Sequence, residues 1–321
     1  MARNPKLEEI VNVINRERTI GVEIEFLIPT DPQIEEDIRT GIASRGGRYS
    51  LYSDKIVKMS DDYLIDVRSG YREPWDPWWQ IKYDVSVEKP GYVGLEIVSP
   101  IITWSQRGQI ETICRMLKEN GCIVNETAGL HIHHGVKGDY QPKDFLRLIN
   151  IYKSLESIID GLVDETRRKH RNDYCYGMNP ISPKESKEIM NWAKETDLSH
   201  EEVKTFVFTY MDYVQRAFDR KTSFYLSHAR YVKLNIASYV NHGTVEFRHH
   251  HGTLDYDEII HWIVFTQRMV ETAKADIDFR DVPKNWVEGL WMLRISTRNE
   301  AKEFIAARMH YSKQRAIYAV F

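Results

Sequence analysis

The chain has 321 residues, of which 42% are hydrophobic and 28% are charged, and its 47 acidic and 44 basic side chains leave a net charge of −3. This composition is typical of a globular protein, and the length suits one large domain or two ordinary ones. The charge excludes a bulk attraction to nucleic acid or to an anionic membrane. Three cysteines without zinc-ligand spacing indicate a reducing cytoplasm, and without an apolar run of 18 residues we expect no membrane span.

The first predicted strand covers residues 19–28. Glu23 and Glu25 alternate there with apolar residues, which occupy every second position from Ile20 to Ile28. Alternation with period two indicates a strand with one apolar face and one polar face. We therefore expect both carboxylates on the polar face.

Residues 30–80 show no such alternation. They contain Gly46-Gly47, several charges, and three tryptophans close to Pro74 and Pro77. We interpret this stretch as a long insertion or lid-like loop, or with equal weight as a packed surface subdomain.

Two further strands, 81–87 and 94–98, flank the turn signal Pro90-Gly91 and are predicted to form a hairpin. Their alternation places Asp84 and Glu96 on the polar face. A helix is predicted next over residues 105–120, where apolar side chains recur at helical spacing before Gly121.

The strand predicted over residues 130–136 directs His131 and His133 to one face and His134 to the other. Apolar stripes predict a helix over residues 142–165 and another over 255–274. A further helix is predicted to begin after a capping box formed by Ser199 and Glu202, and two more are predicted near 283–294 and 298–310.

A second hairpin is predicted from strands 231–240 and 244–250, which are joined by Asn241-His242-Gly243. Its polar positions include Lys233 and Asn235 on the first strand and Glu246 and Arg248 on the second. Because strands and helices do not alternate regularly, the fold class is α+β, with a curved antiparallel sheet and helices packed on one face. We expect a single domain over residues 1–321, ending in a helical segment at about 275–321.

Carboxylates dominate the polar positions of these strands, although one polar face alone would indicate only contact with water. If the strands share a sheet, five carboxylates converge: Glu23, Glu25, Asp84, Glu96 and Glu246. Carboxylates that are close together repel one another, and hard divalent cations such as Mg²⁺ or Mn²⁺ relieve that repulsion.

Zinc is the competing metal, because His131 and His133 with one carboxylate have the ligand types of a zinc hydrolase. We interpret His134, His249 and His251 as hydrogen-bonded structural residues. Arg248 suits a phosphate or a salt bridge to a nearby carboxylate, and the basic run 167–171 suits a solvated helix end or a phosphate.

Five motifs in order carry a family resemblance: Gly-Val-Glu-Ile-Glu-Phe (21–26), Asp84-Val-Ser86, Gly-Leu-Glu-Ile-Val-Ser-Pro (94–100), Gly-Leu-His-Ile-His (129–133) and Thr-Val-Glu-Phe-Arg (244–248). Together they resemble the amidoligase family. This family belongs to the carboxylate–amine ligases with a glutamine synthetase-like catalytic fold, beside glutamate–cysteine ligase.

The resemblance implies a role for each matched position. Glu25, Asp84 and Glu96 are expected to hold one metal near the acceptor carboxylate. A second metal, on the nucleotide phosphates, is expected on Glu23, His133 and Glu246, with His131 as the alternative to His133. Arg248 is similar to an arginine that steadies the transferred phosphoryl group, so Arg248, Asp84 and Glu25 form the expected catalytic set. The stretch Arg171-Asn-Asp-Tyr-Cys175 resembles a family loop, and Arg171 and Lys233 join His133 and Arg248 as expected nucleotide-binding residues.

The function implied is an ATP- and Mg²⁺-dependent ligase that forms an amide through an acyl phosphate. Its substrates would be a small-molecule or peptide carboxylate and an amine, with no nucleic acid or membrane required. Ser86, Lys233 and Asn235 either orient substrates or are polar side chains in contact with water. The alternatives are a metal-dependent hydrolase with a His-x-His and carboxylate site, and a non-catalytic nucleotide-binding module. The substrates and the oligomeric state stay open.

Overall fold

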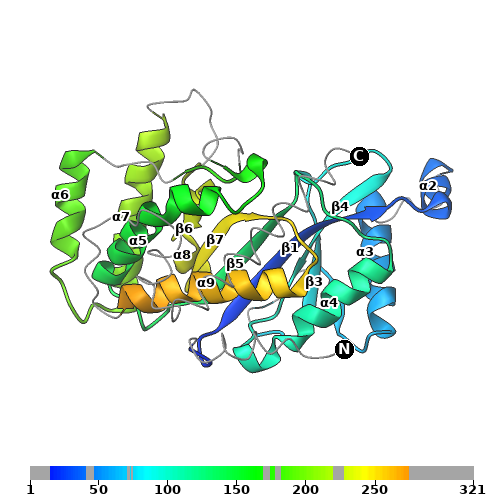
Figure 1. Ribbon diagram of the computed structural model, residues 1–321, viewed down its shortest axis with the longest axis horizontal. Coiled ribbons are helices and arrows are strands. Elements are labelled where there is room, and N and C mark those ends of the chain that lie inside the picture. The colour runs from blue at the N-terminus through cyan, green and yellow to red at the C-terminus, as the bar shows by residue number, and fades with distance from the viewer. Residues whose placement is uncertain are drawn as a thin grey trace. The chain divides into compact units, whose positions relative to one another are not determined.

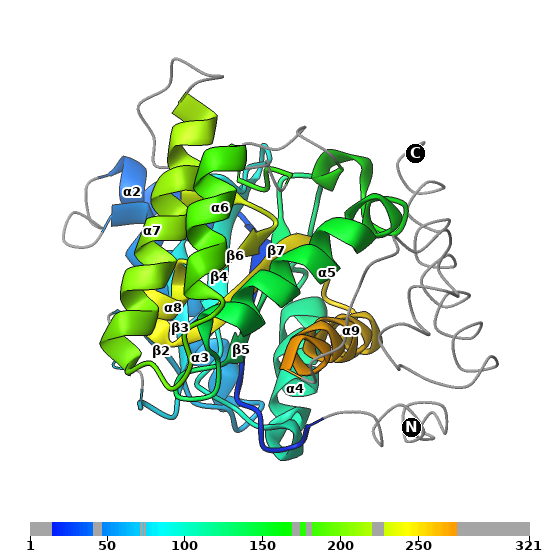
Figure 2. The same ribbon diagram turned by 90° about the vertical axis from the view of Figure 1, so that its left-hand side faces the viewer.

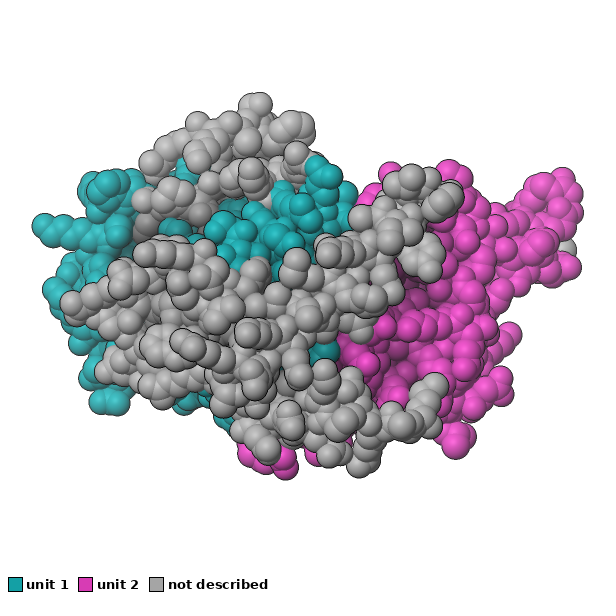
Figure 3. Space-filling view, viewed as in Figure 1, with its two compact units in different colours: residues 1–15, 133–249, 261–321 teal, residues 16–132, 250–260 magenta. Residues whose placement is uncertain are grey.

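The computed structural model, shown in Figure 1 and Figure 2, describes residues 15–40, 47–70, 73, 75–168, 174–177, 182–219 and 228–274. These residues fall into two compact units, which Figure 3 colours separately. Unit 1 comprises residues 1–15, 133–249 and 261–321, and unit 2 comprises residues 16–132 and 250–260. The predicted helices near 283–294 and 298–310, the segment 275–321 and Arg171 lie outside the described residues.

The strands form an open, mostly antiparallel sheet of seven strands in the order β2-β3-β4-β1-β5-β7-β6, so the fold class is α+β (Figure 1). In unit 2, β1 (Ile20–Pro29) pairs antiparallel with β4 (Tyr92–Val98), and β4 pairs antiparallel with β3 (Trp79–Tyr83). The short strand β2 (Val67–Ser69), which the sequence did not predict, runs parallel to β3. The predicted strands around β1, β4 and β5 (Gly129–Gly135) are confirmed to within about two residues at their ends.

The core of unit 2 follows the alternation of β1. The apolar positions from Ile20 to Ile28 are at most 1% exposed, whereas Glu23 lies on the other face and is only half-buried. Helix α4 (Gly108–Glu119) follows the short 3₁₀ helix η1 (Trp104–Gln106) and buries its predicted apolar stripe, which includes Ile110 and Leu117. Gly121 ends this segment with a φ of 74°, as its predicted position after the helix requires.

The stretch 30–80 is not an unstructured loop. It contains α2 (Pro32–Arg39) and α3 (Gly47–Asp61), and α3 buries Tyr52 and Ile56. The Tyr49 hydroxyl donates to the Ile81 carbonyl of β3 at 2.9 Å, so α3 is packed on the sheet edge. The subdomain interpretation therefore describes this part of the stretch, and a lid function stays a prediction.

The predicted strand 81–87 was too long, because β3 ends at Tyr83. Asp84 accepts hydrogen bonds from the Ser86 backbone N–H at 2.8 Å and from the Ser86 hydroxyl at 2.6 Å, which turns the chain out of the sheet. As a result Tyr83 and Val85, which flank Asp84 in the alternating sequence, are 52% and 72% exposed.

Unit 1 is mainly helical. Helix α7 (His200–Asp219) contacts both α5 (Pro142–Asp160) and α6 (Pro183–Trp192), as Figure 2 shows. The predicted capping box before α7 is confirmed, because the Ser199 backbone N–H donates to Glu202 at 2.8 Å. The remaining elements are η2 (Glu165–Arg167), η3 (His228–Tyr231), β6 (Leu234–Asn235), α8 (Ser238–His242), β7 (Thr244–His251) and α9 (Tyr256–Lys274). Like β5, the elements β7 and α9 have residues in both units.

The predicted strand 231–240 was wrong over most of its length. Only β6 is extended, and Asn235 then accepts a hydrogen bond from the Ala237 backbone N–H at 2.9 Å, which turns the chain into α8. Gly243 ends α8 in the left-handed conformation with a φ of 68°. Within the described ranges, no helix has both the length and the apolar character that crossing a membrane requires.

Candidate functional site

Unit 2 brings together three carboxylates from separate parts of the chain. Glu25 of β1 lies directly opposite Glu96 of β4 in the antiparallel pair. Asp84 follows β3, held by the two hydrogen bonds from Ser86. One oxygen of each of the three carboxylates lies within 4.8 Å of the others, which is close enough for all three to share one cation.

The electrostatics of this cluster favour a cation. Burial of Glu96 raises its pKa well above the usual 4.5, and the nearby charges of Glu23 and Glu25 act in the same direction. Lys82, whose ammonium lies 3.8 Å from a Glu96 oxygen, acts in the opposite direction but does not compensate. A divalent ion with oxygen ligands offsets this repulsion directly.

His131 lies between Glu25 of this cluster and a further carboxylate, Glu23. Its Nδ1 is 3.1 Å from Glu23, and its Nε2 is 3.3 Å from Glu25. Glu23, Glu96 and His131 form a second group whose ligand atoms lie within 4.8 Å of one another. The sequence left open whether His131 or His133 binds metal, and this arrangement makes His131 the histidine of the unit 2 cluster.

A second polar group lies on β5, β6 and β7 in unit 1. His133 Nε2 is 4.0 Å from Glu246 Oε1, and the Asn235 amide donates to Glu246 Oε2 at 2.7 Å. The Arg248 guanidinium forms an ion pair with the same Glu246 carboxylate. The salt-bridge alternative for Arg248 is therefore present, while its predicted phosphoryl role stays a prediction.

The predicted second metal site has ligands in both units. His133 and Glu246 belong to unit 1 and Glu23 belongs to unit 2. A shared ion on these three residues stays a prediction.

Lys233 is fully buried in unit 1 against helix α5. Its ammonium is 2.6 Å from Asp160 and 3.1 Å from Glu156. These ion pairs account for the burial of Lys233 without a nucleotide. Its predicted nucleotide-binding role stays a prediction.

His249 completes this buried network. The Tyr152 hydroxyl lies 2.6 Å from His249 Nδ1, and His249 Nε2 lies 2.8 Å from Asp160. Burial lowers the pKa of His249 to about 4, although Asp160 acts in the opposite direction. Burial would raise the pKa of Asp160, but hydrogen bonds from His249 and Lys233 hold it well below its usual value. A neutral His249 that accepts from Tyr152 and donates to Asp160 satisfies all three groups.

Unit 2 also contains a pocket of about 760 Å³ beside the turn that carries Asp84. Residues on both sides of Asp84 line it, together with aromatic rings and charges of both signs from α3, β4 and the neighbouring loops. The lining side chains include Arg48, Tyr49, Tyr83, Val85, Glu88, Lys89, Tyr92 and Glu126. The sequence did not predict this pocket, because its walls come from the stretch 30–80 as well as from the predicted hairpin.

The chain was compared with curated proteins and with the sequence patterns of known families. None of the curated proteins with which the chain was compared matches it. The sequence pattern of the family described as "Putative amidoligase enzyme" matches residues 16–270. This range covers well over half of the chain and includes all five motifs that carry the resemblance. The chain therefore belongs to the family of amidoligase enzymes that this description names.

Proposed function

We propose that the protein is an ATP- and Mg²⁺-dependent carboxylate–amine ligase that forms an amide through an acyl phosphate. The observation that carries this proposal is the meeting of Glu25, Asp84 and Glu96 within 4.8 Å in unit 2. Family membership supports an amidoligase activity, and the carboxylate cluster supports a hard divalent cation. The finer fold proposed is that of a glutamine synthetase-like catalytic domain over the whole chain, with helices on one face of the sheet.

Two metal sites belong to the proposal. Glu25, Asp84 and Glu96 hold one Mg²⁺, and Glu23 holds the second together with Glu246 and either His133 or His131. When bound, such ions offset the charge of the nucleotide phosphates and of the transferring group. Mn²⁺ has the same preference for these ligands.

The chain's own residues position the reactants. A substrate carboxylate oxygen bonds to the γ-phosphorus of ATP while the bond to ADP breaks, which gives an acyl phosphate and ADP. The amine nitrogen then bonds to the acyl carbon, phosphate leaves, and the nitrogen loses a proton. Arg248, exchanging its ion pair with Glu246 for the transferring phosphoryl oxygens, stabilises the charge in the first step.

The pocket beside Asp84 is the proposed site for the carboxylate substrate. Its tyrosines provide flat apolar walls, and Arg48 and Lys89 provide cations for an acidic group. A pocket of about 760 Å³ has room for a small-molecule or peptide carboxylate.

The test is an assay of ADP and phosphate release with ATP, Mg²⁺ and pools of amino acids, short peptides and polyamines. We expect ADP release that needs both a carboxylate and an amine. Glu25→Gln is expected to abolish it without unfolding the protein, because the amide cannot replace a charged metal ligand. Glu36→Gln, in an exposed ion pair with Arg39 on α2, is the matched control and should keep full activity. ADP release that survives Glu25→Gln would count against the proposal.

A metal-dependent hydrolase is the second candidate, and the contacts of His131 with Glu23 and Glu25 favour it. One imidazole among carboxylates can hold a metal that activates water. The same assay separates the two candidates, since hydrolysis of amides or esters without ATP supports the hydrolase. Nucleotide binding without turnover would instead indicate a non-catalytic module.

A further inference from the structure

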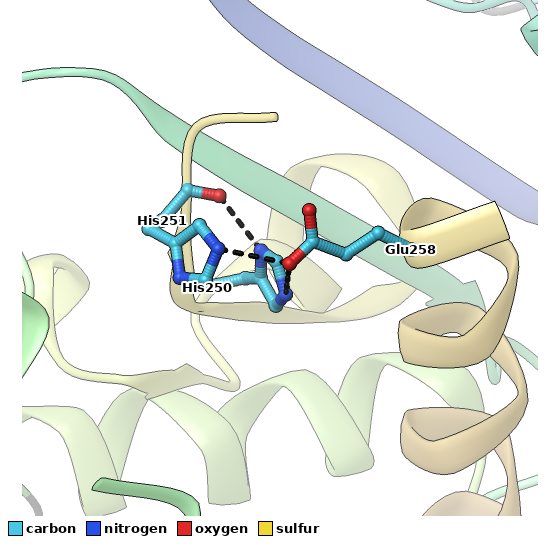
Figure 4. Close-up of side chains that lie close together, drawn as sticks. All are labelled: His250, His251 and Glu258. Carbon is cyan, nitrogen blue, oxygen red and sulfur yellow. Dashed lines mark hydrogen bonds and ion pairs between the residues drawn. The ribbon is translucent and has the colours of Figure 1, made fainter. Parts of the chain in front are cut away.

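A second buried cluster in unit 2 lies apart from the carboxylates of the proposed active site. His250 and His251 are the last two residues of β7, and Glu258 lies in the first turn of α9. The three residues are 0%, 3% and 3% exposed. Figure 4 shows the two imidazole rings facing the same carboxylate.

The distances within this cluster suit one small cation. Glu258 Oε1 is 2.9 Å from His251 Nε2 and 3.8 Å from His250 Nε2, and the three ligand atoms all lie within 4.8 Å of one another. A tetrahedral zinc ion with bonds of about 2.0 to 2.1 Å separates its ligand atoms by about 3.3 Å. The two oxygen–nitrogen separations, 2.9 Å and 3.8 Å, lie on either side of that value. Small side-chain shifts therefore suffice to admit the ion.

The tautomer of His250 is also the one that a metal ligand needs. Its Nδ1 lies 2.7 Å from the backbone carbonyl of His251. A carbonyl oxygen only accepts hydrogen bonds, so Nδ1 carries the proton, and in the neutral ring Nε2 is the nitrogen that can bind a metal. Nε2 faces the Glu258 carboxylate, which is also an acceptor when ionised. Metal-binding histidines have this arrangement, with one ring nitrogen donating to a carbonyl and the other facing the metal.

The loop between the histidines and Glu258 is held firmly. The Gly252 backbone N–H donates to the Ala128 carbonyl at 2.7 Å, and a Cβ at position 252 would lie 2.5 Å from Ala128 Cβ. Asp255 accepts from the Glu258 backbone N–H at 3.0 Å and fixes the start of α9. The ligand-bearing ends of β7 and α9 are therefore placed before any ion binds.

We propose that His250, His251 and Glu258 bind a structural Zn²⁺ that fastens the end of β7 to the start of α9. Two imidazoles and one carboxylate favour zinc over magnesium, which prefers an all-oxygen shell. A buried carboxylate beside two imidazoles also gains a full counter-charge from the ion. The site does not depend on the proposed ligase reaction, because none of its residues has a role in that reaction.

The test measures metal content and not activity. The full chain is loaded with Zn²⁺, dialysed against excess Mg²⁺ and a weak chelator, and analysed by elemental mass spectrometry. We expect about one equivalent of retained zinc, and a visible spectrum of four-coordinate Co²⁺ when cobalt replaces it. His250→Gln and Glu258→Gln should each weaken zinc binding by more than about tenfold. Loss of a residue that only hydrogen-bonds to a metal ligand already has an effect of about this size.

Two controls separate this site from other sources of binding. Glu96→Gln removes a carboxylate of the proposed magnesium cluster and should leave the retained zinc unchanged. His134→Gln removes another buried histidine, whose Nε2 lies 2.8 Å from the Thr266 hydroxyl, and should also leave the zinc content unchanged.

Wild-type protein that retains no zinc, or Glu258→Gln that retains as much as wild type, would overturn the proposal. The cluster would then be a hydrogen-bonded part of the core. If the ligand variants fail to fold, the wild-type protein still decides the question. Stoichiometric Zn²⁺ in the presence of excess Mg²⁺ must raise its melting temperature, and an unchanged melting temperature refutes the site.

Discussion

Glu96 is a partly buried carboxyl that lies close to two others, Glu25 on β1 and Asp84 in the turn after β3. Burial and the charges of Glu23 and Glu25 raise its pKa, so its ionised form is costly in the metal-free protein. An amide at this position keeps the shape of the side chain and removes that charge. The same change also removes one of the oxygen ligands proposed for Mg²⁺.

We expect Glu96→Gln to stabilise the metal-free protein by about 1 kcal/mol, the usual scale of a point substitution. Mg²⁺ should raise the melting temperature of the wild-type protein and leave that of the variant nearly unchanged. Thermal unfolding with and without Mg²⁺ measures both effects, and Glu36→Gln should respond to Mg²⁺ as the wild type does. An equal Mg²⁺ response in Glu96→Gln would remove this residue from the metal site.

His249 makes the stability of the folded protein depend on pH. Its pKa in the folded protein is about 4, against an ordinary value of 6.5, because burial favours the neutral ring. Between pH 4 and pH 6.5, His249 therefore binds a proton in the unfolded chain and stays neutral in the folded protein. The stabilisation from neutral His249 is complete above pH 6.5 and is lost as the pH falls from 6.5 towards 4.

His249→Gln should remove this part of the acid sensitivity. Urea unfolding between pH 4 and pH 7 should show a slope of unfolding free energy against pH that is smaller by up to about 1.4 kcal/mol per pH unit. The low pKa of Asp160 adds a further loss of stability at more acidic pH, which the variant alters only partly. Identical slopes in the variant and the wild type would refute the buried neutral histidine.

At the scale of elements, Gly94 lets the turn after β3 fold back on β4. A Cβ at this position would lie 1.9 Å from the Val87 carbonyl oxygen and 2.8 Å from the Asp84 carbonyl oxygen. Both neighbours are backbone atoms and cannot rotate away. Any side chain at position 94 must therefore displace the turn that holds Asp84 near Glu25 and Glu96.

Gly94→Ala should destabilise the protein by about 1 to 3 kcal/mol, as overpacking of a close contact does. It should also weaken Mg²⁺ binding although no ligand is changed, because Asp84 moves with the turn. Gly108→Ala is the matched control, since its added Cβ meets no atom within 4 Å other than those of its chain neighbours and its own helix backbone, and it should preserve both properties. Calorimetric titration with Mg²⁺ measures the binding, and full affinity in Gly94→Ala would contradict this account.

At the scale of the whole molecule, the chain passes between the two units at four points, and three of them lie inside regular elements, whereas the fourth, at 15/16, precedes β1. The boundaries at 132/133, 249/250 and 260/261 fall within β5, β7 and α9. Disrupting either unit therefore breaks backbone hydrogen bonds of elements that also contribute residues to the other unit. This arrangement favours cooperative unfolding.

We expect a single unfolding transition in urea. Circular dichroism and the fluorescence of Trp79 in unit 2 and Trp262 in unit 1, both buried, should give coincident curves. Variants that retain Trp79 or Trp262 as the sole one of the eight tryptophans report each unit separately. Two separated midpoints would show that the units unfold independently.

Much of the fold was predictable from the sequence, and the errors in the strand predictions have a common cause. The alternation in β1 and the apolar stripes of α4, α5, α7 and α9 gave the positions of these elements within a few residues at most ends. The strand predictions failed where a side chain accepts a hydrogen bond from the backbone N–H two residues later. Asp84 accepts from Ser86 in this way, and Asn235 accepts from Ala237. Helix α3 was missed because its buried face includes Ser53 and Ser60, which weaken the apolar signal.

The sequence by itself determined which side chains share a face of one strand or helix, because the periods of 2 and 3.6 are properties of consecutive residues. It thereby gave the α+β class and the carboxylates that lie on polar faces. Only the tertiary structure decided that Glu25 faces Glu96, that His131 joins their cluster, that Arg248 pairs with Glu246, and that His250 and His251 meet Glu258. The distance between segments far apart in the chain depends on strand register and helix packing, which no local pattern encodes.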